Sequence, residues 1–264
     1  PKSFDHTIPI PLPHEIQRPL LLSLLSSHPF RLIALLAPSG FGKTTLLSQY
    51  ARLSPSPFWL SLSDDSQDLS FFSFSLLSAL SPLPFPSFSS ALSSPDFSPS
   101  SLAHAFLSDL QHLPPFQLFL DQIQHLSPSS ASFLNLLFPK LPPSFLFLLS
   151  GYTPHHLNFS HLLSKNLALI LDSHHLRFSP SEITHYLSIK NPTLSPSTLS
   201  HLDGWPAGLS LHSSSTSHFF DPHALIQELL SDTLSLFPQF PTLATHAIWT
   251  QSVFERIGLP SHLL

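Results

Sequence analysis

Cysteine and methionine are both missing from the 264 residues of this chain. The absence of cysteine excludes disulfides and thiolate metal sites, and it is compatible with a reducing compartment, so we expect a cytoplasmic location. Methionine is missing even at the first position, which is Pro1, and this predicts that the chain is a piece of a longer protein. No secretory signal peptide is visible at its beginning.

Charged residues are scarce as well, at 9% of the chain, compared with about 25% in ordinary domains. The 10 Lys and Arg residues are scattered along the sequence, and the formal net charge is −5. Nucleic-acid binding requires clustered cations that neutralise phosphates, so we expect no direct nucleic-acid contact by this chain. Polar residues or prolines interrupt the richest apolar stretches well short of a membrane span, so we expect no membrane contact either.

Short apolar runs recur along the first two thirds of the chain, with helix-like stretches between most of them. Runs of this length, bounded by polar and turn residues, predict buried strands. Strands that alternate with helices predict an α/β fold with a parallel sheet covered by helices on both faces. The predicted strands are 31–37, 58–62, 116–121, 145–150 and 167–171.

The nine residues APSGFGKTT, at 37–45, follow the first predicted strand and open a helix-like stretch. Strand, loop and helix in this order are the setting of a phosphate-binding loop. Backbone N–H groups around Gly40 and Gly42 can turn toward phosphate oxygens, Lys43 reaches the terminal phosphates, and Thr44 supplies a hydroxyl to Mg²⁺. The sequence therefore predicts a nucleotide-binding domain of the P-loop NTPase type.

The run QLFLDQ, at 117–122, is an apolar strand that ends in an acid. In folds of this kind ligands bind beyond the carboxyl ends of the strands, so we expect Asp121 and Thr44 to share the Mg²⁺. The next residue, Gln122, stands where an acid that activates the attacking water is usual. Glutamine can orient water but accepts a proton poorly, so we expect slow turnover with Asp121 and Gln122 as the catalytic candidates.

We expect four segments along the chain, the last of which is 237–264. Residues 1–27 form an N-terminal segment with a helix at 19–26, and residues 28–178 form the P-loop domain. Within that domain, residues 81–100 are too rich in serine and proline to continue a helix and predict a surface excursion. The strand pattern stops after about residue 178, which predicts an all-helical arm at 179–236.

Several motifs together resemble the regulatory ATPases typified by the maltose-regulon activator, which are LuxR-type large ATP-binding transcription regulators of the STAND class of signalling ATPases. The similarity extends from about Gln17 to the end of the chain, where 244–258 resembles the start of a winged-helix-like domain, here 237–264. The motifs are APSGFGKTTLL at 37–47, FWLSLSDD at 58–65, LFLDQ at 118–122, LLSGYTP at 148–154, LRFSPSE at 176–182 and LDGWPAGL at 202–209.

The resemblance implies roles for individual residues. The loop residues Ser39, Gly40, Phe41, Gly42, Lys43, Thr44 and Thr45 would hold the phosphates of ATP or ADP together with Mg²⁺, and Asp121 would be the metal-binding acid. Pro206 would lie near the adenine and let the helical arm sense which nucleotide is bound. Arg18, in IQRPLLLSLL, would pack beside the base. A plainer alternative for Pro206 is the start of a helix, since proline favours the first helical turn.

Ala37 replaces the usual first glycine of the phosphate loop. The chain departs from the family pattern at three further positions, of which Gln122 replaces the second acid and Gln124 stands where histidine is frequent. Gly151 replaces an arginine that would help to sense the γ-phosphate, and the loss of a cationic contact weakens discrimination between nucleotides.

The function expected from these features is an ATP-dependent signalling switch, the nucleotide-binding core of a transcription regulator that hydrolyses ATP slowly if at all. The ATP-bound form would self-associate, while inducer and DNA would bind through domains outside this chain. Two alternatives stay open: an active P-loop ATPase of another type, which Gln122 and the scarcity of arginine disfavour, and a nucleotide-free scaffold, which the intact Gly42-Lys43-Thr44 disfavours.

Overall fold

A computed structural model describes residues 6–27, 30–63, 68–152, 156–190, 199–200 and 202–214, the last four of these as backbone only. The chain forms two compact units. The sheet unit contains the described residues of 1–11, 17–37 and 43–172. The helical unit contains 12–16, 38–42 and the described residues from 173 onward.

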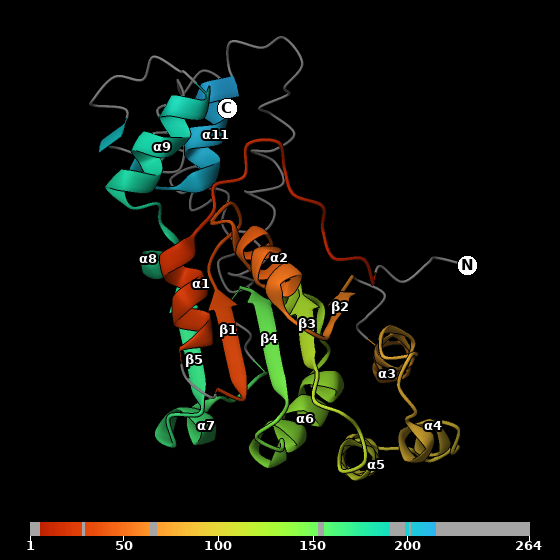
Figure 1. Cartoon of the computed structure of the whole chain (residues 1–264). Helices are drawn as coiled ribbons and strands as arrows, with labels where there is room; N and C mark the ends of the chain where they lie inside the picture. The colour runs from red at the N-terminus through yellow and green to blue at the C-terminus, as the bar shows by residue number, and fades with distance from the viewer. Residues whose placement is uncertain are drawn as a thin grey trace, which may run out of the picture. The chain divides into compact units, whose positions relative to one another are not determined.

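The sheet unit is built on a five-stranded parallel sheet in the order β2-β3-β4-β1-β5 (Figure 1). All five predicted strands are confirmed, each within about one residue of its expected ends. Their bounds are β1 Leu32–Leu36, β2 Pro57–Ser61, β3 Gln117–Asp121, β4 Leu146–Gly151 and β5 Ala168–Asp172.

Side chains alternate between the two faces of this sheet, because successive residues of a strand point in opposite directions. On one face, Phe119 of β3 stacks on Trp59 with ring centroids 5.9 Å apart, and it also contacts Tyr50 at 6.3 Å. Tyr50 belongs to α2 (Lys43–Leu53), which packs on this face together with α1 (Pro19–Ser26) (Figure 1).

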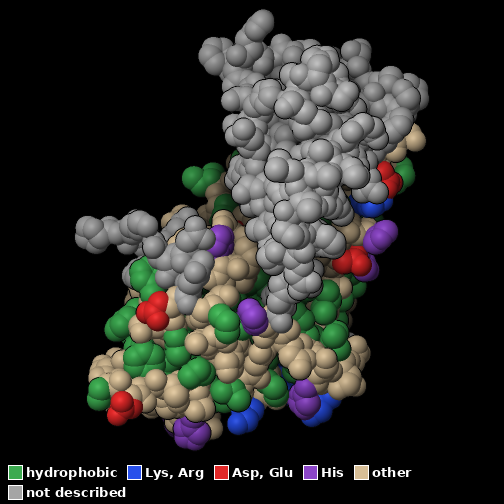
Figure 2. Space-filling view, turned by 180° about the vertical axis from the view of Figure 1, so that it is seen from behind, with side chains coloured by type: hydrophobic (Ala, Val, Ile, Leu, Met, Phe, Trp, Pro, Cys, Tyr) green, Lys and Arg blue, Asp and Glu red, His purple; other side chains and the backbone are tan. Residues whose placement is uncertain are grey.

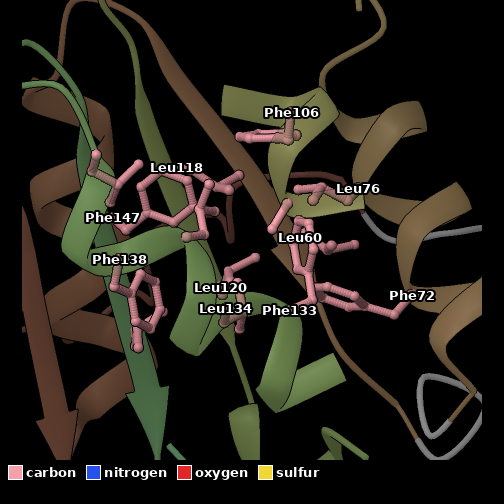
Figure 3. Packing of buried hydrophobic residues seen from close by; sticks show 14 of the residues in the cluster. Leu60, Phe72, Leu76, Phe106, Leu118, Leu120, Phe133, Leu134, Phe138 and Phe147 are labelled. Atoms are coloured by element: carbon pink, nitrogen blue, oxygen red, sulfur yellow. The ribbon is translucent and has the colours of Figure 1, made fainter. Parts of the chain in front are cut away.

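The opposite face carries the larger apolar core. Leu118 and Leu120, the neighbours of Phe119 in β3, are fully buried there. Phenylalanines of the covering helices meet them, among them Phe72, Phe106 and Phe133 (Figure 3). These helices are α3 (Leu69–Ala79), α5 (Pro99–Leu110) and α6 (Pro128–Leu137). Helices thus cover both faces of the sheet, as the alternation of strands and helices predicts.

Residues 81–100 differ from the expected surface excursion, because part of this stretch is the helix α4 (Pro86–Leu92). Phe88 is fully buried in the core, and its ring meets that of Phe106 edge-on at 5.2 Å. Pro86 starts the helix, and the carboxylate of Asp109 accepts the backbone N–H groups of Ser87 at 3.1 Å and Phe88 at 2.8 Å. A proline at the first helical position and a carboxylate at the N-terminus both favour a helix here.

Short helices complete the sheet unit: η2 (Ile123–His125), η3 (Phe138–Lys140) and α7 (Ser160–Ser164). The helical unit contains α8 (Ser173–Leu176), α9 (Pro180–Lys190) and α11 (Pro206–Ser214). Its apolar cluster includes Ile16, Tyr186, Leu202 and Leu209.

The helix expected at 19–26 is present as α1, and α9 and α11 are helices within the stretch expected to be a helical arm. The expected winged-helix segment at 237–264 lies outside the described residues, as does the part of the arm from residue 215 to 236. The division into these four segments stays a prediction.

On the face shown in Figure 2, the few Lys and Arg side chains of the described residues form no large patch and lie among polar and apolar side chains. Within the described ranges, no helix has both the length and the apolarity that crossing a membrane requires.

Candidate phosphate and metal site

The expected phosphate loop connects β1 to α2, which begins at Lys43. Gly40 and Gly42 have φ angles of +80° and +72°, in the left-handed region that glycine adopts at little cost. Ser39 and Phe41 are half-buried beside them, and Thr44 and Thr45 follow Lys43 in the first turn of α2. The first backbone N–H groups of a helix have no partner within the helix, so this turn offers donors to an anion.

Lys43 lies over the ring of Tyr152, with its ammonium nitrogen 5.3 Å from the ring centroid. Tyr152 follows β4 and is almost fully buried. An aromatic face attracts a cation within about 6 Å through its quadrupole. The ring therefore helps to hold the Lys43 ammonium at the carboxyl end of the sheet.

Asp121, the last residue of β3, accepts two hydroxyl hydrogen bonds in the sheet unit. The Oγ1 of Thr44 lies 3.1 Å from its Oδ1 and 3.0 Å from its Oδ2, and the hydroxyl of Ser150 donates to Oδ1. The order of the strands explains why Thr44 and Ser150 both reach Asp121, because β4 lies between β1 and β3. The end of β4 therefore places Ser150 between Asp121 and the strand that leads into the loop.

The environment of Asp121 suits a cation. Burial raises the pKa of this carboxyl above its ordinary value of 3.8, while the hydrogen bonds of Ser150 and Thr44, the backbone N–H of Gln122 and the charge of Lys43 act in the opposite direction. Burial disfavours the ionised form because it removes water from the charge. A nearby divalent cation would compensate for that loss.

The oxygen donors fit Mg²⁺ rather than a transition metal. Within the described residues, no group of three or more His, Asp or Glu side chains is placed to hold a metal. Mg²⁺ does not need such a group, because in nucleotide sites it is bound by one or two protein oxygens and completes its shell with phosphates and water. Thr44 and Asp121 supply one hydroxyl and one carboxylate of this kind.

Gln122 follows Asp121 with φ 62° and ψ 47°, a left-handed conformation, and its side chain is exposed. Gly151 ends β4, and its carbonyl accepts the N–H of Ala37 at 3.1 Å. A Cβ at Gly151 would lie 2.6 Å from Cγ1 of Ile123 and 2.9 Å from Oε1 of Gln124. The position where the family pattern has arginine is thus closed by neighbouring side chains.

Pro206 is the first residue of α11, which agrees with the plainer reading of this proline as a helix start. The next residue, Ala207, donates its N–H to the carbonyl of Gly40 at 3.0 Å, within the helical unit. Arg18 is buried immediately before α1, in the sheet unit. The nucleotide contacts expected for Arg18, Pro206 and the loop residues stay predictions.

Sequence reasoning missed two residues of this site, Ser150 and Tyr152. Both flank Gly151 in the run LLSGYTP, for which the sequence analysis considered only the replacement of arginine by Gly151. Their position at the end of a predicted strand was the available signal, since ligands of parallel sheets bind at that end. The strand order that brings them beside Asp121 and Lys43 was not visible in the sequence.

No protein-family model matches the chain. Among individual proteins, it is 24% identical over 230 residues to the HTH-type transcriptional regulator MalT of Vibrio campbellii, a match that covers 80% of this chain and 25% of the relative. MalT of Klebsiella pneumoniae is 36% identical over 73 residues, which cover 27% of the chain and 8% of the relative. The chain thus spans about a quarter of the length of the Vibrio relative.

Two solved structures share the fold. The first is a signal transduction ATPase with numerous domains (STAND) from Pyrococcus horikoshii that carries a tetratricopeptide repeat sensor. It has a TM-score of 0.60 and 14% identity, and the match covers 88% of this chain and 34% of that one. A Walker-type ATPase of Pyrococcus abyssi has a TM-score of 0.52 and 16% identity, with 84% and 73% covered. The chain therefore has the P-loop NTPase fold that these two structures share, and it resembles the MalT regulators in sequence.

Proposed function

We propose that this chain is the nucleotide-binding core of a signal-transduction switch in a transcription regulator, and that it binds ATP and ADP with Mg²⁺. The observation that carries the proposal is the convergence of Lys43, Thr44, Asp121 and Ser150 at the carboxyl end of the sheet. The 3.0 Å contact between Thr44 and Asp121 joins two motifs that the sequence identified independently. Similarity to the MalT regulators supports the regulatory role.

The residues divide the work by chemistry. The backbone N–H groups of 39–45 donate to phosphate oxygens, and the ammonium of Lys43 neutralises part of the phosphate charge. Thr44 and Asp121 hold Mg²⁺, which supplies electrostatic stabilisation of the phosphates when bound. Ser150 donates to Asp121 and fixes the orientation of its carboxylate.

Hydrolysis is slow in this proposal. The residue next to Asp121 is a glutamine, which positions a water but is a poor base. The site of the γ-phosphate arginine is occupied by Ile123 and Gln124, which pack against Gly151. The output is therefore conformational: each nucleotide shifts the population of forms by its differential affinity, and the ATP form self-associates.

Other parts of the full regulator would sense the inducer and bind DNA. Nucleic acid and membranes are not partners of this chain in the proposal, because its 10 Lys and Arg residues are scattered along the sequence and no described helix has the length and apolarity that a membrane span requires. Such a regulator would work in the cytoplasm.

Thermal unfolding with and without Mg-ADP or Mg-ATP tests nucleotide binding. A ligand at a hundredfold excess over its Kd adds about 2.7 kcal/mol to the free energy of unfolding. Lys43→Ala should abolish the shift, whereas Lys140→Ala, which removes an exposed lysine from η3, should retain it. A folded wild-type chain that shifts with neither nucleotide would favour the scaffold alternative.

Phosphate release distinguishes a switch from an active ATPase. We expect turnover far below the range of about 1 to 1,000 per second that is typical of enzymes. Gln122→Glu should raise the rate, because general-base catalysis contributes about 100- to 10,000-fold where a base is correctly placed. Wild-type turnover within the enzyme range would refute the switch.

A further inference from the structure

The middle of the phosphate loop belongs to the helical unit. Residues 38–42 cluster with the segment that starts at Ser173, while Lys43 and the rest of α2 belong to the sheet unit.

Trp205 fills the space beside Gly40 and Gly208. A Cβ at Gly40 would lie 2.9 Å from the indole Nε1 and 3.2 Å from Cε2. A Cβ at Gly208 would lie 2.5 Å from Cε3 and 3.2 Å from Cζ3 of the same indole. The pyrrole edge of Trp205 thus faces one glycine and its benzene edge faces the other, and neither position has room for a side chain without movement.

Ala207 completes the contact. Its Cβ is the atom nearest to the missing side chain of Gly40, at 2.6 Å, and its N–H donates to the Gly40 carbonyl at 3.0 Å. That N–H is one of the first donors of α11, which have no partner inside the helix. The loop thereby caps the helix, and the helix fixes the orientation of a loop peptide.

The residue before Trp205, Gly204, is also held in place by a backbone hydrogen bond. Gly204 has φ +72°, its carbonyl accepts the N–H of Phe178 at 2.8 Å, and a Cβ there would lie 2.5 Å from the carbonyl oxygen of Phe178. The indole N–H of Trp205 is buried and has no acceptor among the described residues. Buried indole N–H groups usually have a partner, so the loop side of this ring retains a donor.

We propose that Trp205 and Ala207 act as a latch on the phosphate loop: their direct contact with Gly40 holds the loop in the conformation that binds nucleotide, so that this contact is coupled to nucleotide affinity. The proposal rests on the proposed function, and it makes Trp205 and Ala207 positioning residues. Coupling is reciprocal, so nucleotide binding must change the environment of the indole by the same free energy with which the latch changes binding.

Two glycine substitutions test the latch without any ligand. Gly40→Ala and Gly42→Ala both place alanine at a positive φ, but a Cβ at Gly42 meets nothing within 4 Å. Gly40→Ala should therefore lower the unfolding midpoint more than Gly42→Ala does. Ala207→Gly removes the nearest clashing atom and should recover part of the loss in the Gly40→Ala background. Equal losses without recovery would show that the contact does not hold the loop.

Nucleotide titrations test the coupling. Trp205→Ala should weaken Mg-ADP binding about 5- to 150-fold, the usual range of coupling between sites, and Trp205→Phe should weaken it less. Leu209→Ala is the matched control, because it truncates a buried residue of α11 in the apolar cluster against which Trp205 packs, and Leu209 is not among the atoms nearest Gly40. It should lower stability with little change in Kd.

Fluorine NMR of the chain labelled with 5-fluorotryptophan gives a readout apart from affinity. The chain has 3 tryptophans, and Trp205→Phe assigns the relevant resonance. We expect Mg-ADP to shift that resonance. An unshifted resonance, or a wild-type Kd in Trp205→Ala, would overturn the latch while the nucleotide site stands. Absence of any binding by the wild type would instead remove the proposed function and the coupling together.

Discussion

The ammonium of Lys43 lies 5.3 Å from the centre of the Tyr152 ring. One residue follows β1 and the other follows β4, and these two strands are hydrogen-bonded neighbours. The parallel pairing therefore places the loop lysine and the aromatic ring at the same end of the sheet. The face of the Tyr152 ring attracts the lysine without adding to the site a negative charge, which would repel a phosphate.

A double-mutant cycle with Lys43→Met and Tyr152→Leu should reveal this attraction. We expect a favourable coupling of about 0.5 to 2 kcal/mol in the free energy of unfolding, the range of partly desolvated cation–π pairs. Tyr152→Phe should preserve most of it, because the ring face remains. Additive single substitutions, measured by chemical denaturation, would contradict the contact.

Asp121→Asn should stabilise the ligand-free chain at neutral pH. Burial raises the pKa of Asp121 above 3.8, so the folded chain binds this proton more tightly than the unfolded one. The contribution of Asp121 to the free energy of unfolding is therefore fully present below pH 3.8, and it is lost as the pH rises through the raised pKa. Asparagine does not ionise and avoids that loss.

The measurement compares unfolding midpoints of wild type and Asp121→Asn from pH 4 to pH 7, with other titrating groups cancelling in the difference. The advantage of the variant should grow with pH. The additional stabilisation that Mg²⁺ gives to the nucleotide complex should disappear in the variant, because the amide has no charge. A difference independent of pH would show that Asp121 titrates normally.

A side chain at Gly151 should not fit between Ile123 and Gln124 without displacing them. Gly151→Ala should destabilise the chain by about 1 to 3 kcal/mol, as overpacking of a filled site does, and Gly151→Arg should cost more. Ile123→Ala removes the Cγ1 atom that lies 2.6 Å from the added Cβ, so the double variant should lose less than the sum of the single losses. Denaturant titration of the four proteins decides this, and strict additivity would refute the clash.

Asp109→Ala should destabilise the chain by about 1 to 3 kcal/mol, because it leaves buried donors of α4 without their acceptor. The carboxylate accepts from Ser87 and Phe88 and is itself buried. Asp96→Ala is the matched control, since Asp96 is exposed. Equal midpoints for the two variants in urea would show that the cap does not stabilise α4.

The strands and the phosphate loop could be predicted from short stretches of sequence, because the apolar runs and glycines that specify them lie within a few residues of one another. The apolar runs predict the ends of β1 to β5 to within about one residue, and the glycines and lysine of 40–43 indicate a loop between a strand and a helix. The helix α4 was missed although Pro86 is a local signal for a helix start, because the carboxylate that accepts its first N–H groups belongs to Asp109, 22 positions from Ser87.

The sequence by itself determined the strands, the phosphate loop and the acid at the end of β3, since hydrophobic periodicity and backbone requirements act over a few residues. Only the tertiary structure decided the strand order β2-β3-β4-β1-β5. That order brings Ser150 to Asp121 and Tyr152 to Lys43. The packing of Trp205 and Ala207 on Gly40 was decided in the same way. Such contacts join residues far apart in the chain, and their free energy comes from packing, which no local pattern encodes.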